Sequence, residues 1–146
     1  METLVKTLEE LDAEAVRFVG GLVPKEGGAT LVTLSGDLGA GKTAFTKAVA
    51  HILGVEEMVT SPTFVLEKIY QLGCETPKFE RLIHIDAYRL EDGKELVHLG
   101  FGELMQDAGN LILLEWPEKV TDALPTPDVR ISFDANTDGS RTLSYA

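Results

Sequence analysis

Residues 36–43 read Gly36-Asp37-Leu38-Gly39-Ala40-Gly41-Lys42-Thr43 and match the pattern G-x-x-x-x-G-K-T. An apolar, β-branched stretch at residues 30–35 precedes them, and residues 44–53 carry apolar side chains at helical spacing. A strand, a glycine-rich turn and a helix N-terminus in this order form an anion site, because backbone N–H groups converge there and the helix dipole adds positive charge.

This arrangement predicts a site for a nucleotide triphosphate. We expect the Lys42 ammonium to reach the β- and γ-phosphates and the Thr43 hydroxyl to ligate Mg²⁺. The residues predicted to bind the nucleotide here are Asp37, Leu38, Gly39, Ala40, Gly41, Lys42, Thr43 and Ala44.

The size and composition of the chain predict one globular domain over residues 1–146. The 44% hydrophobic and 25% charged residues are ordinary values, and the chain is long enough to bury a core of its own. The net charge of −11 argues against a broad electrostatic grip on nucleic acid, which needs Lys and Arg to displace counterions. A role with RNA would therefore be indirect, through a partner protein.

Cross-links and membrane contact are also predicted to be absent. Cys74 is the only cysteine, so we expect neither a disulfide partner nor a cysteine-based zinc site. The first residues lack the apolar core of a signal peptide, and no apolar run approaches the length of about 18 residues that a membrane helix needs. The expected location is the cytoplasm.

Hydrophobic periodicity outlines the other elements. We expect helical or turn-like segments at residues 8–22, 44–53 and 91–102, and strands at residues 30–35, 64–71, 80–85, 111–114, 129–133 and 142–145. No helix separates the strands at 64–71 and 80–85, so an all-parallel sheet is disfavoured. We predict a three-layer α/β domain with a P-loop NTPase fold and a mixed sheet: a parallel core, antiparallel additions and a C-terminal hairpin that turns at residues 136–140.

Two acidic residues end predicted strands, where ligands gather in open α/β sheets. Glu115 closes the apolar run at 111–114, the best candidate for the strand that supports Mg²⁺. The usual residue there is Asp, and a water-mediated contact can absorb the extra methylene. Asp86 ends the strand at 80–85 and could hold a metal-bound water, orient the attacking water or cap the turn that follows.

A loop at Ser61-Pro62-Thr63 lies between the P-loop helix and the next strand. P-loop switch proteins place here a hydroxyl that senses the γ-phosphate through Mg²⁺. Ser61 and Thr63 are the candidates, and an ordinary proline turn is the alternative.

Three residues close to Asp86 or Glu115 in the sequence are candidates either for the site or for a purely structural role. Trp116 directly follows Glu115 and is predicted to form a wall of the pocket. His84 lies on the same strand face as Asp86 and is expected to pack or hydrogen-bond rather than catalyse. Arg89 could add positive charge near the phosphates or pair with a surface carboxylate.

The base is predicted to be adenine. Switch-type GTPases carry an N-K-x-D element for guanine, and neither Asn110 nor Asn136 is followed by Lys. A small P-loop kinase would need an arginine-rich lid over the transferred phosphate, but the arginines of this chain are scattered. ATP with Mg²⁺ is therefore the expected pair of ligands.

Four motifs together resemble one family. They are residues 36–43, Ser61-Pro62-Thr63-Phe64, His84-Ile85-Asp86-Ala87-Tyr88-Arg89-Leu90 and Leu114-Glu115-Trp116-Pro117-Glu118. In this order, and in a chain of this length, they resemble the TsaE family of P-loop ATPases, which acts in bacterial tRNA threonylcarbamoyladenosine biosynthesis. The resemblance extends from the first helix to the last hairpin.

The resemblance implies an ATP-binding and ATP-hydrolysing subunit that works with the TsaB and TsaD proteins. Together they place a threonylcarbamoyl group on the adenosine next to the anticodon of tRNAs that read codons beginning with A. In that family this subunit does not transfer the group itself, so the resemblance implies docking on the TsaB–TsaD complex. From the acidic net charge we expect contact with tRNA only indirectly, through these partners. Two alternatives stay open: an interaction module in which ATP binding rather than hydrolysis is the signal, and a small P-loop kinase.

The same resemblance implies roles for individual residues. They are Lys42 and Thr43 for phosphate and Mg²⁺, Asp86 and Glu115 as the two functional carboxylates, Trp116 beside the nucleotide and Thr63 in the switch-like loop. Between the two carboxylates, we assign Glu115 to the metal and Asp86 to the water, which makes Lys42 and Asp86 the expected catalytic residues. The N-terminal helix region and Arg141 are also implied to approach the nucleotide. Since no arginine finger is evident, slow turnover is expected until a partner completes the site.

Overall fold

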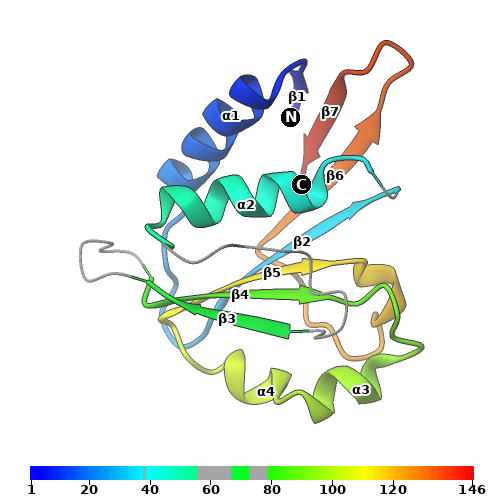
Figure 1. Cartoon of the computed structure of the whole chain (residues 1–146). Helices are drawn as coiled ribbons and strands as arrows, with labels where there is room; N and C mark the ends of the chain where they lie inside the picture. Colours follow the sequence, from blue (N-terminus) through cyan, green and yellow to red (C-terminus); the bar gives the residue numbers. More distant parts are fainter. Residues whose placement is uncertain (38, 56–66, 73–78) are drawn as a thin grey trace.

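The sheet carries its parallel strands in the middle and its antiparallel strands at both edges (Figure 1). The computed structural model describes residues 1–37, 39–55, 67–72 and 79–146. In chain order the elements are β1 (Glu2–Val5), α1 (Leu8–Gly21), β2 (Thr30–Gly36), α2 (Lys42–Ile52), β3 (Glu67–Gln71), β4 (Arg81–Asp86), α3 (Gly93–His98), α4 (Phe101–Leu104), β5 (Asn110–Glu115), the 3-10 turn η1 (Pro117–Lys119), β6 (Val129–Ala135) and β7 (Arg141–Tyr145).

The strand order is β1-β7-β6-β2-β5-β4-β3. Strands β6, β2, β5 and β4 run parallel. Strand β3 is antiparallel to β4 at one edge, whereas β7 and β1 add antiparallel pairs at the other. The predicted mixed sheet with a C-terminal hairpin is therefore confirmed.

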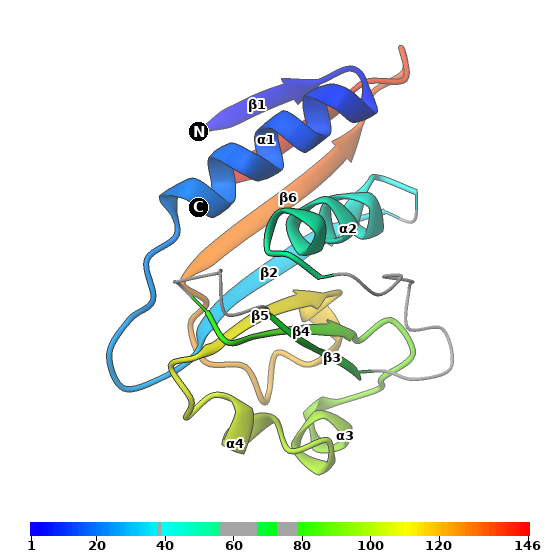
Figure 2. The same cartoon turned by 60° about the vertical axis from the view of Figure 1, so that its left-hand side comes forward.

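Helices cover both faces of the sheet and give the three predicted layers (Figures 1 and 2). The core on one face joins the sheet to α1 and α2, and the core on the other joins it to α3 and α4. All six residues of β5 are buried. Leu111 and Leu113 belong to the first core, and Ile112 and Leu114 to the second, which explains the unbroken apolar run of this strand.

The ends of the helices follow local chemistry. The Thr7 hydroxyl caps α1 by accepting a hydrogen bond from the Glu10 N–H at 3.1 Å, so this helix begins at the predicted residue. Helix α2 begins at Lys42, two residues before the predicted start, because the last residues of the glycine-rich motif form its first turn. The segment predicted as helical at 91–102 is two short helices separated at Gly100, whose φ is +81°.

Some predictions differ from the structure or lie outside it. Strand β1 was not predicted; it is four residues long and exists through its pairing with β7, far away in the sequence. Of the strand expected at 64–71, the described part is β3, Glu67–Gln71. Leu38, Ser61, Thr63 and Cys74 lie outside the described residues.

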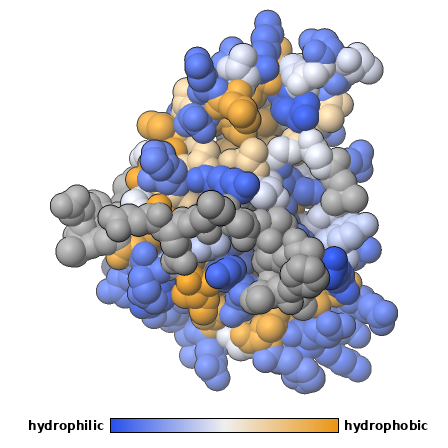
Figure 3. Space-filling model, viewed as in Figure 1, coloured by the Kyte–Doolittle hydropathy of each residue, from blue (hydrophilic) through white to orange (hydrophobic). Residues whose placement is uncertain are grey.

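Hydrophilic side chains dominate the face in Figure 3, where the visible apolar residues form small, separate patches. None of the helices in the described part of the chain combines the length and apolarity needed to cross a bilayer.

Candidate functional site

The P-loop connects the end of β2 to the start of α2. Gly36, Gly39 and Gly41 all have positive φ, at +139°, +80° and +107°. A Cβ on Gly36 would lie 2.3 Å from the Phe133 carbonyl oxygen, so no side chain fits at that position. Gly41 is the N-cap of α2, and no side chain among the described residues caps this helix. The N–H groups of the first turn of α2 are therefore suited to bind an anion.

Lys42 is buried and folded back over the loop. Its Nζ donates to the carbonyl oxygen of Gly36 and, at 3.4 Å, to that of Asp37. The same ammonium lies 3.7 Å from the centre of the Trp116 ring. Burial lowers the pKa of Lys42, and nearby carboxylates, Glu115 first among them, act in the opposite direction. The positive charge is thus held at the loop by carbonyls and an aromatic face.

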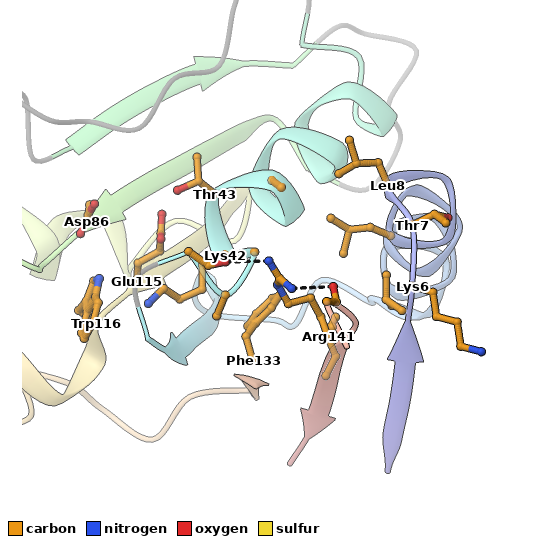
Figure 4. Close-up of a pocket in the computed structure, with 18 residues that line it drawn as sticks. Lys6, Thr7, Leu8, Lys42, Thr43, Asp86, Glu115, Trp116, Phe133 and Arg141 are labelled. Carbon is orange, nitrogen blue, oxygen red and sulfur yellow. Dashed lines mark hydrogen bonds between the residues drawn. The ribbon is translucent and has the colours of Figure 1, made fainter. Parts of the chain in front are cut away.

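Asp86 and Glu115 lie at the carboxyl ends of β4 and β5, where they are partners in the strand register. Glu115 is also the register partner of Leu34 in β2, which places both carboxylates beside the P-loop. Both line one cavity together with Thr43, and the three side chains face one another in Figure 4. The topology therefore brings together the two carboxylates that the sequence pointed to.

The environments of the two carboxylates differ. Asp86 is half-buried and accepts a hydrogen bond from the Tyr88 N–H at 3.0 Å. This bond is the turn cap that was the structural alternative to a functional role for Asp86. Burial raises the pKa of Asp86, although this hydrogen bond acts against the rise. Glu115 is buried and bonded to His84 at 2.5 Å, which confirms the hydrogen-bonding role expected of that histidine.

The donor set here fits a hard cation. Among the described residues, no three His, Cys, Asp or Glu side chains are arranged to hold a metal by themselves. A Mg²⁺ ion at a P-loop takes most of its ligands from phosphates and water, however, and needs few protein oxygens. Thr43 and Glu115 supply a hydroxyl and a carboxylate at one cavity, which suits Mg²⁺ rather than a softer metal.

The cavity has a volume of about 490 Å³ and continues beyond the P-loop to the N-terminal part of the chain. This second part is mostly apolar; its lining side chains include Val5, Leu8, Leu11, Phe133 and Leu143. They come from β1, α1, β6 and β7, the edge of the sheet opposite β3. A flat apolar base could bury its faces here, close enough to the loop for its phosphates to reach α2.

Arg141 joins this apolar part to the P-loop. Its guanidinium donates to the Gly39 carbonyl oxygen at 3.1 Å and to that of Gly139 at 2.8 Å. The two bonds tie the β6–β7 turn to the loop (Figure 4). Arg141 and the start of α1 thus line the cavity, and their approach to a nucleotide stays a prediction.

Trp116 forms a wall of the cavity, as predicted. Among the described residues it is the only non-glycine with positive φ, at +62°. Its ring packs against Tyr88 with the centroids 5.0 Å apart, and its backbone N–H donates to the Leu34 carbonyl oxygen. An unusual backbone conformation thus turns the indole toward Lys42.

The predicted nucleotide-binding residues do not all lie in the cavity. Residues 39–44 line it. Asp37 is exposed and outside the described lining, and contributes its carbonyl to Lys42. Arg89 is exposed and likewise outside that lining. Val5, Phe133 and Leu143 carry no local signal in the sequence, because only the pairing of distant strands brings them to the site.

Known proteins resemble this chain over nearly its whole length. Residues 4–143 match the family described as "Threonylcarbamoyl adenosine biosynthesis protein TsaE". The tRNA threonylcarbamoyladenosine biosynthesis protein TsaE of Rickettsia prowazekii is 39% identical over 115 residues, which are 78% of this chain and 75% of that protein. The protein of the same name from Bacillus subtilis is 34% identical over 140 residues, covering 96% of this chain and 82% of the relative.

A solved structure has a similar fold. The crystal structure of Bacillus subtilis YdiB superposes with a TM-score of 0.77 at 29% sequence identity. The superposition covers 99% of this chain and 83% of that one. The family match and the structural match therefore both cover almost the whole chain.

Proposed function

The chain belongs to the TsaE family, and on that premise we propose that it is the ATP-binding and ATP-hydrolysing subunit of tRNA threonylcarbamoyladenosine biosynthesis. The pathway follows from the family; the chemistry is our proposal. One observation carries it: the P-loop lysine, the Thr43 hydroxyl and two strand-end carboxylates meet at one cavity. These are the groups that a P-loop NTPase needs to bind and cleave a triphosphate.

ATP would lie along the cavity, with its phosphates at the N-terminus of α2. The backbone N–H groups of the loop and the Lys42 ammonium would neutralise the phosphate oxygens. Thr43 and Glu115 would hold Mg²⁺, which supplies positive charge to the phosphate chain when bound. Adenine would occupy the apolar part, between the Leu8 end of α1 and the hairpin residues.

Hydrolysis would then depend on positioning. In-line attack by water forms a bond to the γ-phosphorus, breaks the bond to the bridging oxygen and releases ADP and phosphate. Asp86 lies at the end of β4 beside Glu115, and we assign it the role of orienting the water. The rise that burial causes in the Asp86 pKa favours this role, because it strengthens the carboxylate as a proton acceptor.

We further propose that the protein works on the TsaB–TsaD complex in the cytoplasm, where that role places it, and meets tRNA only through these partners. A net charge of −11 supports the indirect contact, since direct RNA binding rests on Lys and Arg. A gel-shift assay with tRNA at low salt should show no complex with the isolated protein. Tight binding by this protein alone would refute the indirect role.

The second candidate is an interaction module for which ATP binding is the signal. The distribution of arginines at the cavity favours it. Among the described lining residues Arg141 is the only arginine, and its guanidinium is bonded to the Gly39 carbonyl oxygen of the loop. No arginine from this set is placed to stabilise the transferred phosphate. This observation also disfavours the small P-loop kinase, which would need such a clamp.

Two measurements test the proposal. Trp116 is the sole tryptophan, so its fluorescence should change when ATP and Mg²⁺ are added, and Lys42→Ala should abolish the change. Asp86→Asn and Glu115→Gln should then be compared in ATP hydrolysis and in tRNA modification reconstituted with TsaB and TsaD. If both variants bind ATP, fail to hydrolyse it and still support repeated modification, the interaction module is the correct function.

A further inference from the structure

His84 and Glu115 form a buried pair below the floor of the cavity. Their Nε2 and Oε2 atoms are 2.5 Å apart, and the exposed fractions of the two residues are 0% and 2%. Glu115 lines the cavity, whereas His84 is not among the described lining residues. Among the described residues, the hydrogen bond that His84 makes to the cavity lining is the one to Glu115.

The strand register explains the contact. Glu115 is the partner of Asp86, and His84 lies two residues earlier on β4, so all three side chains project from the same sheet face. The partner of His84 itself is Leu113, an apolar residue. The imidazole thus reaches along the sheet toward its carboxyl end and contacts Glu115 from the interior of the protein.

The direction of the hydrogen bond follows from the other ring nitrogen. His84 Nδ1 has no hydrogen-bond partner among the described residues. A buried N–H without an acceptor costs free energy, so the proton belongs on Nε2, which donates to the carboxylate. One oxygen of Glu115 is therefore fixed by a donor that is itself packed in the core.

From this arrangement we propose that His84 is a positioning residue for the metal site: it fixes Glu115 Oε2 so that the remaining carboxylate oxygen faces Thr43 and Mg²⁺. The inference rests on the proposed function, since it assigns Glu115 to Mg²⁺. Groups that bond to a metal ligand from behind set its orientation, and losing one weakens metal binding by about 10- to 100-fold. His84 would thus determine how much Mg²⁺ strengthens nucleotide binding.

The test compares two substitutions that differ in one hydrogen bond. His84→Gln keeps a side-chain N–H near the position of Nε2, whereas His84→Leu fills the space without a donor. The dissociation constant of the non-hydrolysable ATP analogue AMP-PNP is measured in EDTA and in saturating Mg²⁺ for each protein. The ratio of the two constants is the gain in affinity from Mg²⁺.

We expect His84→Leu to reduce this gain by about 10- to 100-fold and His84→Gln to preserve most of it. The dissociation constant in EDTA should stay unchanged in both. In a protein that already carries Glu115→Gln, adding His84→Leu should not reduce the gain in affinity from Mg²⁺ any further, because His84 would act on the metal only through Glu115. The matched control is Ile83→Val, the neighbouring β4 residue in the opposite core; it should lower Tm and leave the gain intact.

Three results would overturn the role of His84. The first is that His84→Leu keeps the full gain in affinity from Mg²⁺, and the second is that His84→Gln loses as much of this gain as His84→Leu. The third is that His84→Leu also weakens AMP-PNP binding in EDTA. If the wild-type protein itself shows no Mg²⁺ gain, the proposed function fails together with the inference. Should His84→Leu not fold, His84→Asn replaces it, since the shorter amide cannot reach Glu115 and Asn should lose the gain that Gln keeps.

Discussion

The two parts of the cavity are built in different ways. The phosphate part comes from the parallel core: the P-loop follows β2, and Asp86 and Glu115 end the adjacent strands β4 and β5. The apolar part comes from the antiparallel edge, where β1, the start of α1 and the β6–β7 hairpin meet. Arg141 joins the two parts through its bond to Gly39.

This difference separates chemistry from affinity. Charged groups at the phosphate part must be placed to within fractions of an ångström, and rigid strand ends and a helix terminus provide that placement. The apolar part only has to remove the faces of a base from water, a contribution that scales with area. Substitutions in the first part should therefore have large effects on catalysis, and those in the second smaller effects on binding or stability.

Lys42→Ala should have the largest effect. The variant loses the ammonium that would meet the β- and γ-phosphates, and we expect ATP hydrolysis to fall by about 100- to 1000-fold, as on removal of other preorganised donors. Steady-state phosphate release measures it. Lys47→Ala, an exposed lysine on the same helix, is the control and should keep full activity. If Lys47→Ala lost as much ATP hydrolysis as Lys42→Ala, the effect would not be specific to the P-loop lysine.

Glu14→Gln should have the next largest effect, and we expect it to lower the stability of the fold. Glu14 is buried and accepts hydrogen bonds from Arg17 and from the Tyr145 hydroxyl, joining α1 to β7. We expect the free energy of unfolding to fall by about 1–3 kcal/mol in urea titrations. The exposed Glu9→Gln on the same helix should change it little.

The pH dependence of the Glu14 effect follows from its pKa. Burial raises this pKa, but the hydrogen bonds from Arg17 and Tyr145 outweigh burial and bring it below the ordinary value of 4.5. Glu14 therefore adds stability above pH 4.5 that is lost as the pH falls through its folded pKa. The difference between wild type and Glu14→Gln should shrink in that acidic range; a constant difference down to low pH would contradict the assignment.

Leu8→Ala tests the apolar part directly. Leu8 lines the cavity while 72% exposed, so its truncation should cost little stability. A bound base would cover it, and losing that contact should weaken ATP binding by on the order of 1 kcal/mol, about 3- to 10-fold. Inorganic triphosphate should bind both proteins equally in calorimetry. Val16→Ala, also exposed on α1, is the matched control, and a loss for triphosphate too would place Leu8 at the phosphates instead.

Asp86→Asn should give the smallest change in stability, and in the opposite direction. Burial raises the Asp86 pKa above its ordinary value of 3.8, so the native state holds this proton more tightly than the unfolded state. The stability that protonation confers is present below pH 3.8 and lost as the pH rises through the folded pKa. At neutral pH the variant should thus melt slightly higher than wild type while it loses hydrolysis, and the two melting temperatures should converge in acid.

The phosphate part of the site was predictable because its information is local. The motif at 36–43 contains both its turn and the start of its helix, and the apolar run before Glu115 identifies a central strand. Both carboxylates could be placed at one sheet edge from parallel topology alone. The placement of these groups matches that expectation, and their roles stay predictions.

The apolar part and the identity of the hydrogen-bond partner of His84 could not be predicted in this way. Val5 and Leu143 reach the cavity because β1 pairs with β7 across almost the whole chain, and β1 itself has no pattern that marks a strand. The bond from His84 to Glu115 depends on the register of β4 against β5. A shift of one residue would turn His84 to the opposite face, and sequence alone does not fix that register.

Trp116 shows that the chain accepts a local cost to keep an indole at the site. A left-handed backbone at a residue other than glycine is unfavourable by roughly 1–2 kcal/mol, and Trp116 adopts it at φ +62°. Laboratory evolution should therefore select different residues at position 116 depending on the property that is selected. A library selected only for heat resistance should admit glycine or asparagine there, whereas one selected for growth that requires the nucleotide-bound protein should retain tryptophan.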